Sequence, residues 1–385
     1  MSGDRALLAE QEVGRINAFF PILPALGNHW AATRPWEGQT IGLNLHVTPL
    51  TAALVNELAL GGANCVLSAV SAATTDAGTV ELLRNQGVEV HTGGDLEDRH
   101  LQVLDHGPSL LVDAGFDLCG ALLAHRKGQI QRIRGAIEMS RSGIAKLRAG
   151  PPVPFPVVNI NDGRLKDAVE NRHGVGEGIW QAVSLLTGMH LAGRRVAIVG
   201  YGPVGRGLAA YARAAGCVVE VVESDPVRRL FAHYDGFATP PLEDAVTRVR
   251  IVVTATGHAG VLRAAQLEQA RDGIVLVNAG RGGDEIDIEG IRRAATRMDN
   301  VADQVVRYRM ESGRRINVLG NGHPLNIVAN SGSPEPVLLA FAVIGLSLER
   351  IAGGMRLSAG EVVVPEEIEA RAAQLALDAI QHSAG

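Results

Sequence analysis

The segment Arg194–Gly207, RRVAIVGYGPVGRG, decides which fold the chain adopts. Its apolar first half is typical of a buried strand, its middle is a glycine-rich turn, and a helix is expected to follow. Each glycine has its own task, because Gly200 makes the tight turn, Gly202 lets the backbone approach a pyrophosphate, and Gly205 lets the helix pack closely on the strand. The N-terminus of such a helix faces the phosphates. The segment therefore predicts a dinucleotide-binding Rossmann unit.

An acidic residue follows this turn at the distance that a dinucleotide site requires. The next strand ends at Glu223, where a carboxylate can accept hydrogen bonds from both ribose hydroxyls of NAD. A carboxylate there repels the 2'-phosphate of NADP, so NAD is the favoured cofactor, while Arg228 and Arg229 keep NADP as an alternative. Ligands of such folds bind outside the carboxyl ends of the strands. The expected cofactor contacts are Gly200, Gly202, Pro203, Val204, Gly205, Glu223, Ser224, Thr254, Ala255, Thr256, Asn278, Ala279 and Gly280.

Alternating apolar and amphipathic segments predict another unit ahead of the dinucleotide unit. Short apolar runs such as IGLNLHVT and SLLVDAG alternate with longer amphipathic stretches, which is typical of parallel strands joined by helices. A proline-rich stretch beginning at Pro151 interrupts this pattern, and the last helices are expected to pack back on the first domain. We expect an α/β protein with two doubly wound parallel-sheet domains. The substrate domain comprises residues 1–176 plus 333–385, and the Rossmann NAD-binding domain comprises residues 177–332.

Composition excludes several classes of protein. Hydrophobic residues make up 46% of the chain and charged residues 20%, which is typical of a globular protein. A net charge of -5 gives no basic field for nucleic acid, so a small molecule is the expected partner. Three widely spaced cysteines predict neither a disulfide framework nor a metal site. The longest apolar run, Val337–Leu348, is too short to span a bilayer, and a cytoplasmic protein without a membrane partner is expected.

The stretch VVNINDGRLKDAVENRHGVGE precedes the dinucleotide unit and combines several polar residues with a lysine. NINDxxxK followed by ENxxG, a helix and AGRRVAIVGYGPVGRG resembles the S-adenosylhomocysteine hydrolase family. The agreement continues through ESDP, VVTATG, NAGRGGDEID, and RYR with GRRI, and the N-terminal part agrees at IGLNLHVT and LVDAG. The resemblance extends from about Gly38 to about Ile380.

The resemblance implies a redox cycle on a nucleoside. In that family NAD oxidises the ribose 3'-hydroxyl, the 4' C–H becomes acidic, the 5' substituent leaves by β-elimination, water adds, and NADH reduces the ketone. Lys166 resembles the base that takes the 3'-hydroxyl proton, and Glu170 stands where the family has an aspartate beside the ribose. Asn161 and Asn171 match the asparagines that position ribose and nicotinamide. Without the resemblance, Lys166 and Glu170 would be interpreted as a solvated ion pair on a helix.

Three further positions follow from the same resemblance. His46 and Thr48 match the LHMT motif near the 5' end of the substrate, which implies a proton-transfer role for His46. A lone histidine on a strand is otherwise usually a core or surface residue. The late Asn326 matches a cofactor contact of the family. Because the family forms tetramers, a homo-oligomer, either a dimer or a tetramer, is expected.

The departures from the family pattern occur at positions that touch the substrate. Leu50 replaces a glutamate and Ser333 replaces a histidine, which alters both polar contacts to the adenine. Met139 replaces a glutamate that holds ribose hydroxyls, and Ala114 replaces a catalytic aspartate. Arg281 stands where the family has a histidine at the 5' end of the substrate. The redox residues are kept while the substrate residues change.

These substitutions favour a changed overall reaction with 3'-oxidation retained. The first hypothesis is an NAD-dependent lyase that eliminates the 5' substituent of an adenosine-like nucleoside, most simply a dehydratase that releases water. One alternative is a divergent hydrolase that releases homocysteine and adenosine from S-adenosylhomocysteine. Another is an inactive NAD-binding regulator, which the retained Lys166 disfavours. An ordinary dehydrogenase that consumes free NAD is the weakest alternative.

Overall fold

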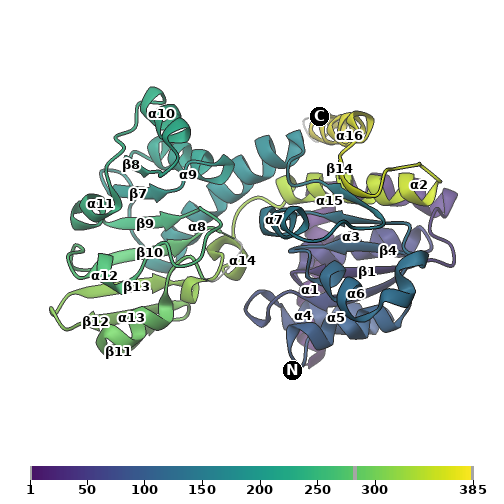
Figure 1. Cartoon of the computed structure of the whole chain (residues 1–385), viewed down its shortest axis with the longest axis horizontal. Helices are drawn as coiled ribbons and strands as arrows, with labels where there is room; N and C mark the ends of the chain where they lie inside the picture. The colour runs from purple at the N-terminus through teal and green to yellow at the C-terminus, as the bar shows by residue number, and fades with distance from the viewer. Residues whose placement is uncertain (1, 281–283, 383–385) are drawn as a thin grey trace. The chain divides into compact units, whose positions relative to one another are not determined.

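The computed structural model describes residues 2–280 and 284–382, which divide into two compact units (Figure 1). The first unit comprises Met1–Asp167 and Pro334–Gly385, and the second comprises Ala168–Ser333. Each unit is built around one sheet whose faces are covered by helices. The expected contact Arg281 lies outside the described residues.

The described part of the first unit forms a seven-stranded parallel sheet in the order β14-β6-β5-β4-β1-β2-β3. Its strands are β1 (Thr40–Leu45), β2 (Asn64–Ala69), β3 (Glu89–His91), β4 (Leu110–Asp113), β5 (Gly135–Glu138), β6 (Pro156–Asn159) and β14 (Gly360–Val363). The central strands are buried along their length, as apolar runs in a sheet covered on both faces should be.

Helices from both ends of the chain cover this first sheet. They are α1 (Ser2–Phe19), α2 (Ile22–Thr33), α3 (Pro49–Leu60), α4 (Ala77–Asn85), α5 (Leu96–Asp105), α6 (Asp117–His125), α7 (Arg141–Ala149), α15 (Glu335–Ala352) and α16 (Glu366–His382). The apolar α15 packs on α2 at Gly345, where a Cβ atom would lie 2.2 Å from the Trp30 ring. The C-terminal segment thus returns to the first unit and adds β14 to its sheet, a strand that the sequence did not predict.

The described part of the second unit forms a seven-stranded sheet in the order β11-β12-β13-β10-β9-β7-β8. Its strands are β7 (Arg195–Val199), β8 (Val218–Val222), β9 (Ile251–Thr254), β10 (Ile274–Asn278), β11 (Ala295–Ala302), β12 (Val305–Met310) and β13 (Arg315–Leu319). The strands from β13 to β8 are parallel, which confirms the predicted α/β class with parallel sheets. The hairpin β11–β12 extends that sheet in antiparallel fashion and was not predicted.

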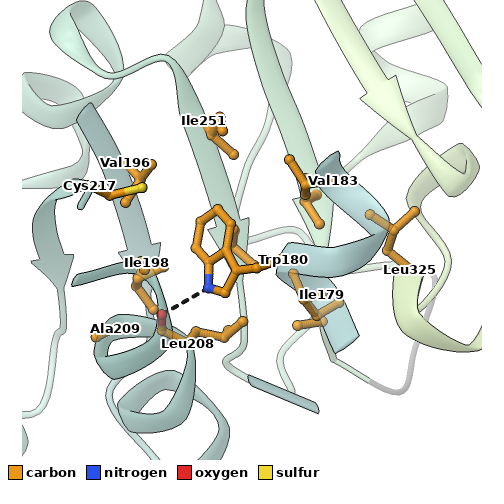
Figure 2. Close-up of a cluster of buried hydrophobic side chains, with 14 of the residues drawn as sticks. Ile179, Trp180, Val183, Val196, Ile198, Leu208, Ala209, Cys217, Ile251 and Leu325 are labelled. Carbon is orange, nitrogen blue, oxygen red and sulfur yellow. Dashed lines mark hydrogen bonds between the residues drawn. The ribbon is translucent and has the colours of Figure 1, made fainter. Parts of the chain in front are cut away.

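Helices α8 and α9 form one hydrophobic cluster of the second unit together with β7 and β9 (Figure 2). The helices of this unit are α8 (Val175–Thr187), α9 (Pro203–Ala214), α10 (Pro226–Tyr234), α11 (Leu242–Arg248), α12 (Ala264–Leu267), α13 (Ile288–Ala294) and α14 (Leu325–Val328). Trp180 of α8 is buried against Ile198, and its indole Nε1 donates a hydrogen bond of 2.9 Å to the carbonyl oxygen of Leu208 in α9. This contact fixes α8 beside the helix that follows the glycine turn.

Candidate functional site

The glycine turn has the close backbone packing that a dinucleotide site needs. Gly200 has φ +100, and a Cβ atom there would lie 2.6 Å from the carbonyl oxygen of Ala255. A Cβ atom on Gly205 would lie 2.0 Å from the carbonyl oxygen of Gly200, so only glycine fits. Gly202 is the N-cap of α9 and has no side chain to cap the amides of the first turn. These amides can therefore bind a pyrophosphate, and the turn fits NAD.

Glu223 follows β8 and is hydrogen-bonded to the glycine turn. Its Oε2 accepts 2.7 Å from the amide of Tyr201, and its Oε1 accepts 2.9 Å from the amide of Asp225. These bonds hold the carboxylate of Glu223 beside the turn, where the sequence predicts a ribose contact. The next residue, Ser224, is exposed.

The ends of β9 and β10 lie side by side and are tied together by Asn278. The buried Asn278 side chain donates 3.0 Å to the carbonyl of Gly280 and 2.8 Å to that of Gly322, and the Thr254 hydroxyl donates 3.3 Å to its Oδ1. The amide of Ala279 in turn donates 2.8 Å to the carbonyl of Thr254. The structure thus brings these predicted cofactor residues together at one sheet edge.

A buried carboxylate that the sequence reasoning missed shapes the same edge. Glu285 accepts from the Thr256 amide at 2.9 Å and from the Gly257 amide at 2.8 Å. A Cβ atom on Gly280 would lie 1.8 Å from the Glu285 carboxylate. Glu285 therefore positions the turns after β9 and β10, and its place in NAGRGGDEID is the one signal that could have indicated it.

Lys166 begins a π-helix, Lys166–Gly174, a rare structure that is frequent at functional sites. Its hydrogen bonds join residues five apart, so Glu170 and Asn171 lie about one turn beyond Lys166. The side chains of Lys166 and Glu170 are each only 8% exposed, while Asp167 between them is exposed. Burial of both charged groups rules out a solvated surface pair.

The π-helix packs directly against the helix that follows the glycine turn. A Cβ atom on Gly207 of α9 would lie 1.9 Å from the carbonyl oxygen of Arg172. His173 Nδ1 and the hydroxyl of Tyr211 are 3.2 Å apart. Within the second unit, the structure therefore brings Asn171, the residue before Arg172, close to the helix of the dinucleotide turn.

Asn326, on α14, is half-buried, and the amide of Ser331 donates 3.0 Å to its carbonyl.

A row of buried polar side chains crosses the first sheet at its carboxyl edge. Asn44, Asp113, Glu138 and Asn159 are neighbours in register on β1, β4, β5 and β6. Asn44 Nδ2 donates 2.9 Å to Asp113 Oδ1, and the amide of Cys119 donates 2.9 Å to Asp113 Oδ2. We call these four residues the polar row. The sequence reasoning did not select Asp113, Glu138 or Asn159.

Glu138 holds the two turns that begin after β4 and β5. Its carboxylate accepts from the amides of Gly115 at 3.0 Å, Phe116 at 2.7 Å and Ser140 at 2.6 Å. Phe116 has φ +58, a strained conformation for a bulky residue, and the bond to Glu138 helps to hold it. Burial and the neighbouring Asp113 carboxylate raise the pKa of Glu138 to about 8, although the bonds from Ser140 and Gly115 oppose this.

We expect Glu138 to make the protein less stable as the pH rises. Between the ordinary carboxyl pKa of 4.5 and about 8, the folded state keeps the Glu138 proton and the unfolded state loses it, so rising pH favours unfolding. Glu138→Gln should remove this part of the pH dependence and lower overall stability by about 1–3 kcal/mol, because an amide cannot accept from all three backbone donors. Urea unfolding across this pH range measures both effects. Glu243→Gln, at an exposed site, should leave the slope unchanged.

The candidate 5' residues lie around the end of β1. His46 Nδ1 is 2.7 Å from Thr74 Oγ1, and the Thr74 hydroxyl donates 3.3 Å to the carbonyl of Ser71. His46 and Thr74 are therefore hydrogen-bonded, and which of the two donates depends on the tautomer of the ring. Thr48 is the N-cap of α3, and Leu50 is half-buried in its first turn.

Two of the positions that depart from the family pattern, Ala114 and Met139, lie beside the polar row. Ala114 follows Asp113, and its amide donates 3.0 Å to the carbonyl of Asn44; Met139 follows Glu138, and its amide donates 3.1 Å to the carbonyl of Asp113. Ala114 and Met139 therefore leave adjacent strands at the same edge.

In the turn after β6, Asn161 Nδ2 donates 2.7 Å to Asp162 Oδ1. Ser333 is half-buried at the end of the second unit.

Comparisons with known proteins agree with these observations. Residues 171–332 match the model of the S-adenosyl-L-homocysteine hydrolase NAD binding domain. The chain is 33% identical over 371 residues to the S-inosyl-L-homocysteine hydrolase of Methanopyrus kandleri, which covers 94% of this chain and 88% of that protein. It is 31% identical over 380 residues to the adenosylhomocysteinase of Pyrococcus abyssi, with 96% and 90% covered.

A solved structure shares the fold at low sequence identity. A dipicolinate synthase from Bacillus halodurans superposes with a TM-score of 0.52 and 14% identity, covering 83% of this chain and 99% of that one. Among the residues that the structure describes, no helix is both long and apolar enough to cross a membrane. With a third of its positions identical to a curated relative along nearly its whole length, the chain belongs to the S-adenosylhomocysteine hydrolase family, and its cofactor is NAD.

Proposed function

We propose that this protein is an NAD-dependent lyase that transiently oxidises the 3'-hydroxyl of an adenosine-like nucleoside and eliminates its 5' substituent as water. Residues 1–176 and 333–385 bind the nucleoside in this proposal, and residues 177–332 bind NAD. The net reaction converts a nucleoside to a 4',5'-unsaturated nucleoside and water. The two electrons removed from C3' return to it, so no NADH accumulates.

The observation that supports elimination is that Ala114 and Met139 replace two carboxylates of the family pattern. Both residues leave adjacent strands beside the polar row, at positions where the family has carboxylates. An apolar side chain cannot hydrogen-bond a sugar hydroxyl or activate water. The residues assigned to 3'-oxidation are kept, whereas the carboxylates that the resemblance implies at these two substrate positions are lost. A reaction that stops after elimination fits this division.

The proposed roles follow from the resemblance to the family at each position. Bound NAD supplies the hydride acceptor for C3'. Lys166 takes the proton of the 3'-hydroxyl, and it is only 8% exposed. Glu170 and Asn161 orient the ribose hydroxyls, and Asn171 positions the nicotinamide.

Proton transfer at the 5' end is assigned to His46. Its Nδ1 is hydrogen-bonded to Thr74, and in this proposal the imidazole removes the 4' proton and delivers it to the departing 5' oxygen. The proton count balances, because the proton taken from C4' leaves with hydroxide as water. Thr48, the N-cap of α3, contacts the 5' oxygen in this proposal.

A hydrolase is the second candidate, and the names of the relatives favour it. The Methanopyrus and Pyrococcus proteins are described as hydrolases of S-inosyl- and S-adenosyl-L-homocysteine. In this chain, such an activity would release homocysteine and the free nucleoside. Leu50 and Ser333 replace the family's adenine contacts. Under both the lyase and the hydrolase hypothesis, the nucleobase of the substrate is therefore not fixed as adenine.

The proposal is tested by following product mass in deuterated water. The NAD-loaded protein is incubated with adenosine, its sugar-modified analogues, inosine, S-adenosylhomocysteine and S-inosylhomocysteine. Elimination should give a product lighter than its nucleoside by one water, with 4' hydrogen exchange in the remaining substrate. Release of homocysteine without the unsaturated product would support the hydrolase instead. Absence of exchange, product and NAD reduction with every compound would contradict both enzymatic candidates.

A further inference from the structure

Two histidines and a glutamate meet at the β3 edge of the first sheet, and the proposed function uses none of the three. Glu89 and His91 belong to the edge strand β3 and are two residues apart, so their side chains leave the same face. His106 follows α5 as its C-cap. One ligand atom from each of the three lies within 4.8 Å of the other two, and no other group of this kind occurs among the described residues.

One ring nitrogen of His91 lacks a hydrogen-bond partner within the described part of the chain. Its Nε2 is buried and has no hydrogen-bond partner among the residues that the structure describes. A buried nitrogen without a partner costs free energy, and a bound cation that accepts its lone pair would remove that cost. The rings of His91 and His106 are 6.0 Å apart between centroids and inclined by 45°, so they do not stack on each other.

We propose that Glu89, His91 and His106 form a binding site for a divalent transition-metal ion, best fitted by Zn²⁺. Two imidazoles and one carboxylate are ligands that Zn²⁺ accepts, whereas Mg²⁺ and Ca²⁺ prefer oxygen ligands. Glu89 and His106 are exposed, so ions can enter from solvent and water can complete the tetrahedron.

The local charges allow this assignment. Glu89 contributes a negative charge to the ion, while the Arg84 guanidinium lies nearby and donates 2.6 Å to the carbonyl of Val90. That positive charge weakens the site without occupying it. A bound ion would join the short edge strand β3 to the end of α5, and so stabilise a strand that has a neighbour on one side only.

The site is tested on the full-length, NAD-loaded protein with Zn²⁺ as the titrant in calorimetry and Co²⁺ as a spectroscopic probe. We expect one strong Zn²⁺ site per chain and the visible absorption of tetrahedral Co²⁺. His106→Ala should weaken Zn²⁺ binding by about tenfold or more and abolish the Co²⁺ bands. His106 is exposed, so this change should leave the fold intact.

His125→Ala is the matched control. His125 Nε2 and Glu97 Oε1 are 2.9 Å apart, so this pair also joins a histidine to a carboxylate but does not belong to the three-ligand group. The control should bind Zn²⁺ as the wild type does, and Glu89→Gln should weaken binding like His106→Ala. Absence of Zn²⁺ binding, or equal binding by the wild type and His106→Ala, would overturn the assignment. Neither result depends on the reaction that the protein catalyses.

Discussion

Lys166→Ala should reduce the rate at which a nucleoside reduces the bound NAD by about 10²–10⁴-fold. The physical reason is that hydride leaves C3' only as the 3'-hydroxyl loses its proton, and the alanine side chain cannot accept a proton. The variant should retain NAD, because the glycine turn and Glu223 are untouched. Single-turnover measurement of NADH absorbance gives the rate, and mass spectrometry of the denatured protein gives the NAD content.

Asp167→Ala is the control on the same helix. Asp167 is exposed, next to Lys166, and its alanine variant should reduce NAD at the wild-type rate. A Lys166→Ala protein that forms NADH as fast as the wild type would show that another group is the base. A variant that loses NAD as well as activity would indicate a structural role for the buried amine. These outcomes separate proton transfer from folding.

Gly205→Ala should weaken NAD binding strongly. The added Cβ atom would lie 2.0 Å from the carbonyl oxygen of Gly200, and both residues belong to the same tight turn, so the turn must change shape. The amides at the start of α9 then no longer converge on a pyrophosphate. We expect NAD affinity to fall by at least about 100-fold, which corresponds to roughly 2.7 kcal/mol. Fluorescence titration with NADH measures this, and circular dichroism monitors the fold.

Two other variants make this test decisive. Gly120→Ala, in α6, adds a Cβ atom that would meet nothing within 4 Å, so it should keep wild-type NAD affinity. Glu223→Ala adds no atom to the turn and should also weaken NAD binding, which covers the case in which Gly205→Ala fails to fold. Normal NAD content in both Gly205→Ala and Glu223→Ala would contradict the assignment of NAD to this turn.

Much of the fold was predictable because buried parallel strands are apolar runs that end at glycines or polar residues. This pattern predicted the strands before and after the glycine turn. The helix Val175–Thr187 was predicted as well. Strand β11 could not be found, because most of its residues are exposed and it lacks an alternating apolar pattern. Strand β14 has four residues at a sheet edge, too few to distinguish from a loop.

The sequence likewise indicates some residues of the candidate site and not others. The glycine turn and Glu223 follow a local spacing, so the sequence indicates them directly. Glu138 and Glu285 act through bonds to the amides of turns 22 to 29 residues away, and no local pattern encodes such contacts. The roles of Lys166, His46 and the substrate contacts rest on the family resemblance and stay predictions.

The return of the C-terminal segment to the first unit has a consequence for the order of folding during synthesis. Residues 168–333 form a continuous piece that can fold as soon as it leaves the ribosome. The first sheet begins at residue 40 but receives β14 only after residue 363 has been translated. The N-terminal strands must therefore wait with an unprotected β6 edge and without α15, and this interval is when the nascent chain is most exposed to aggregation.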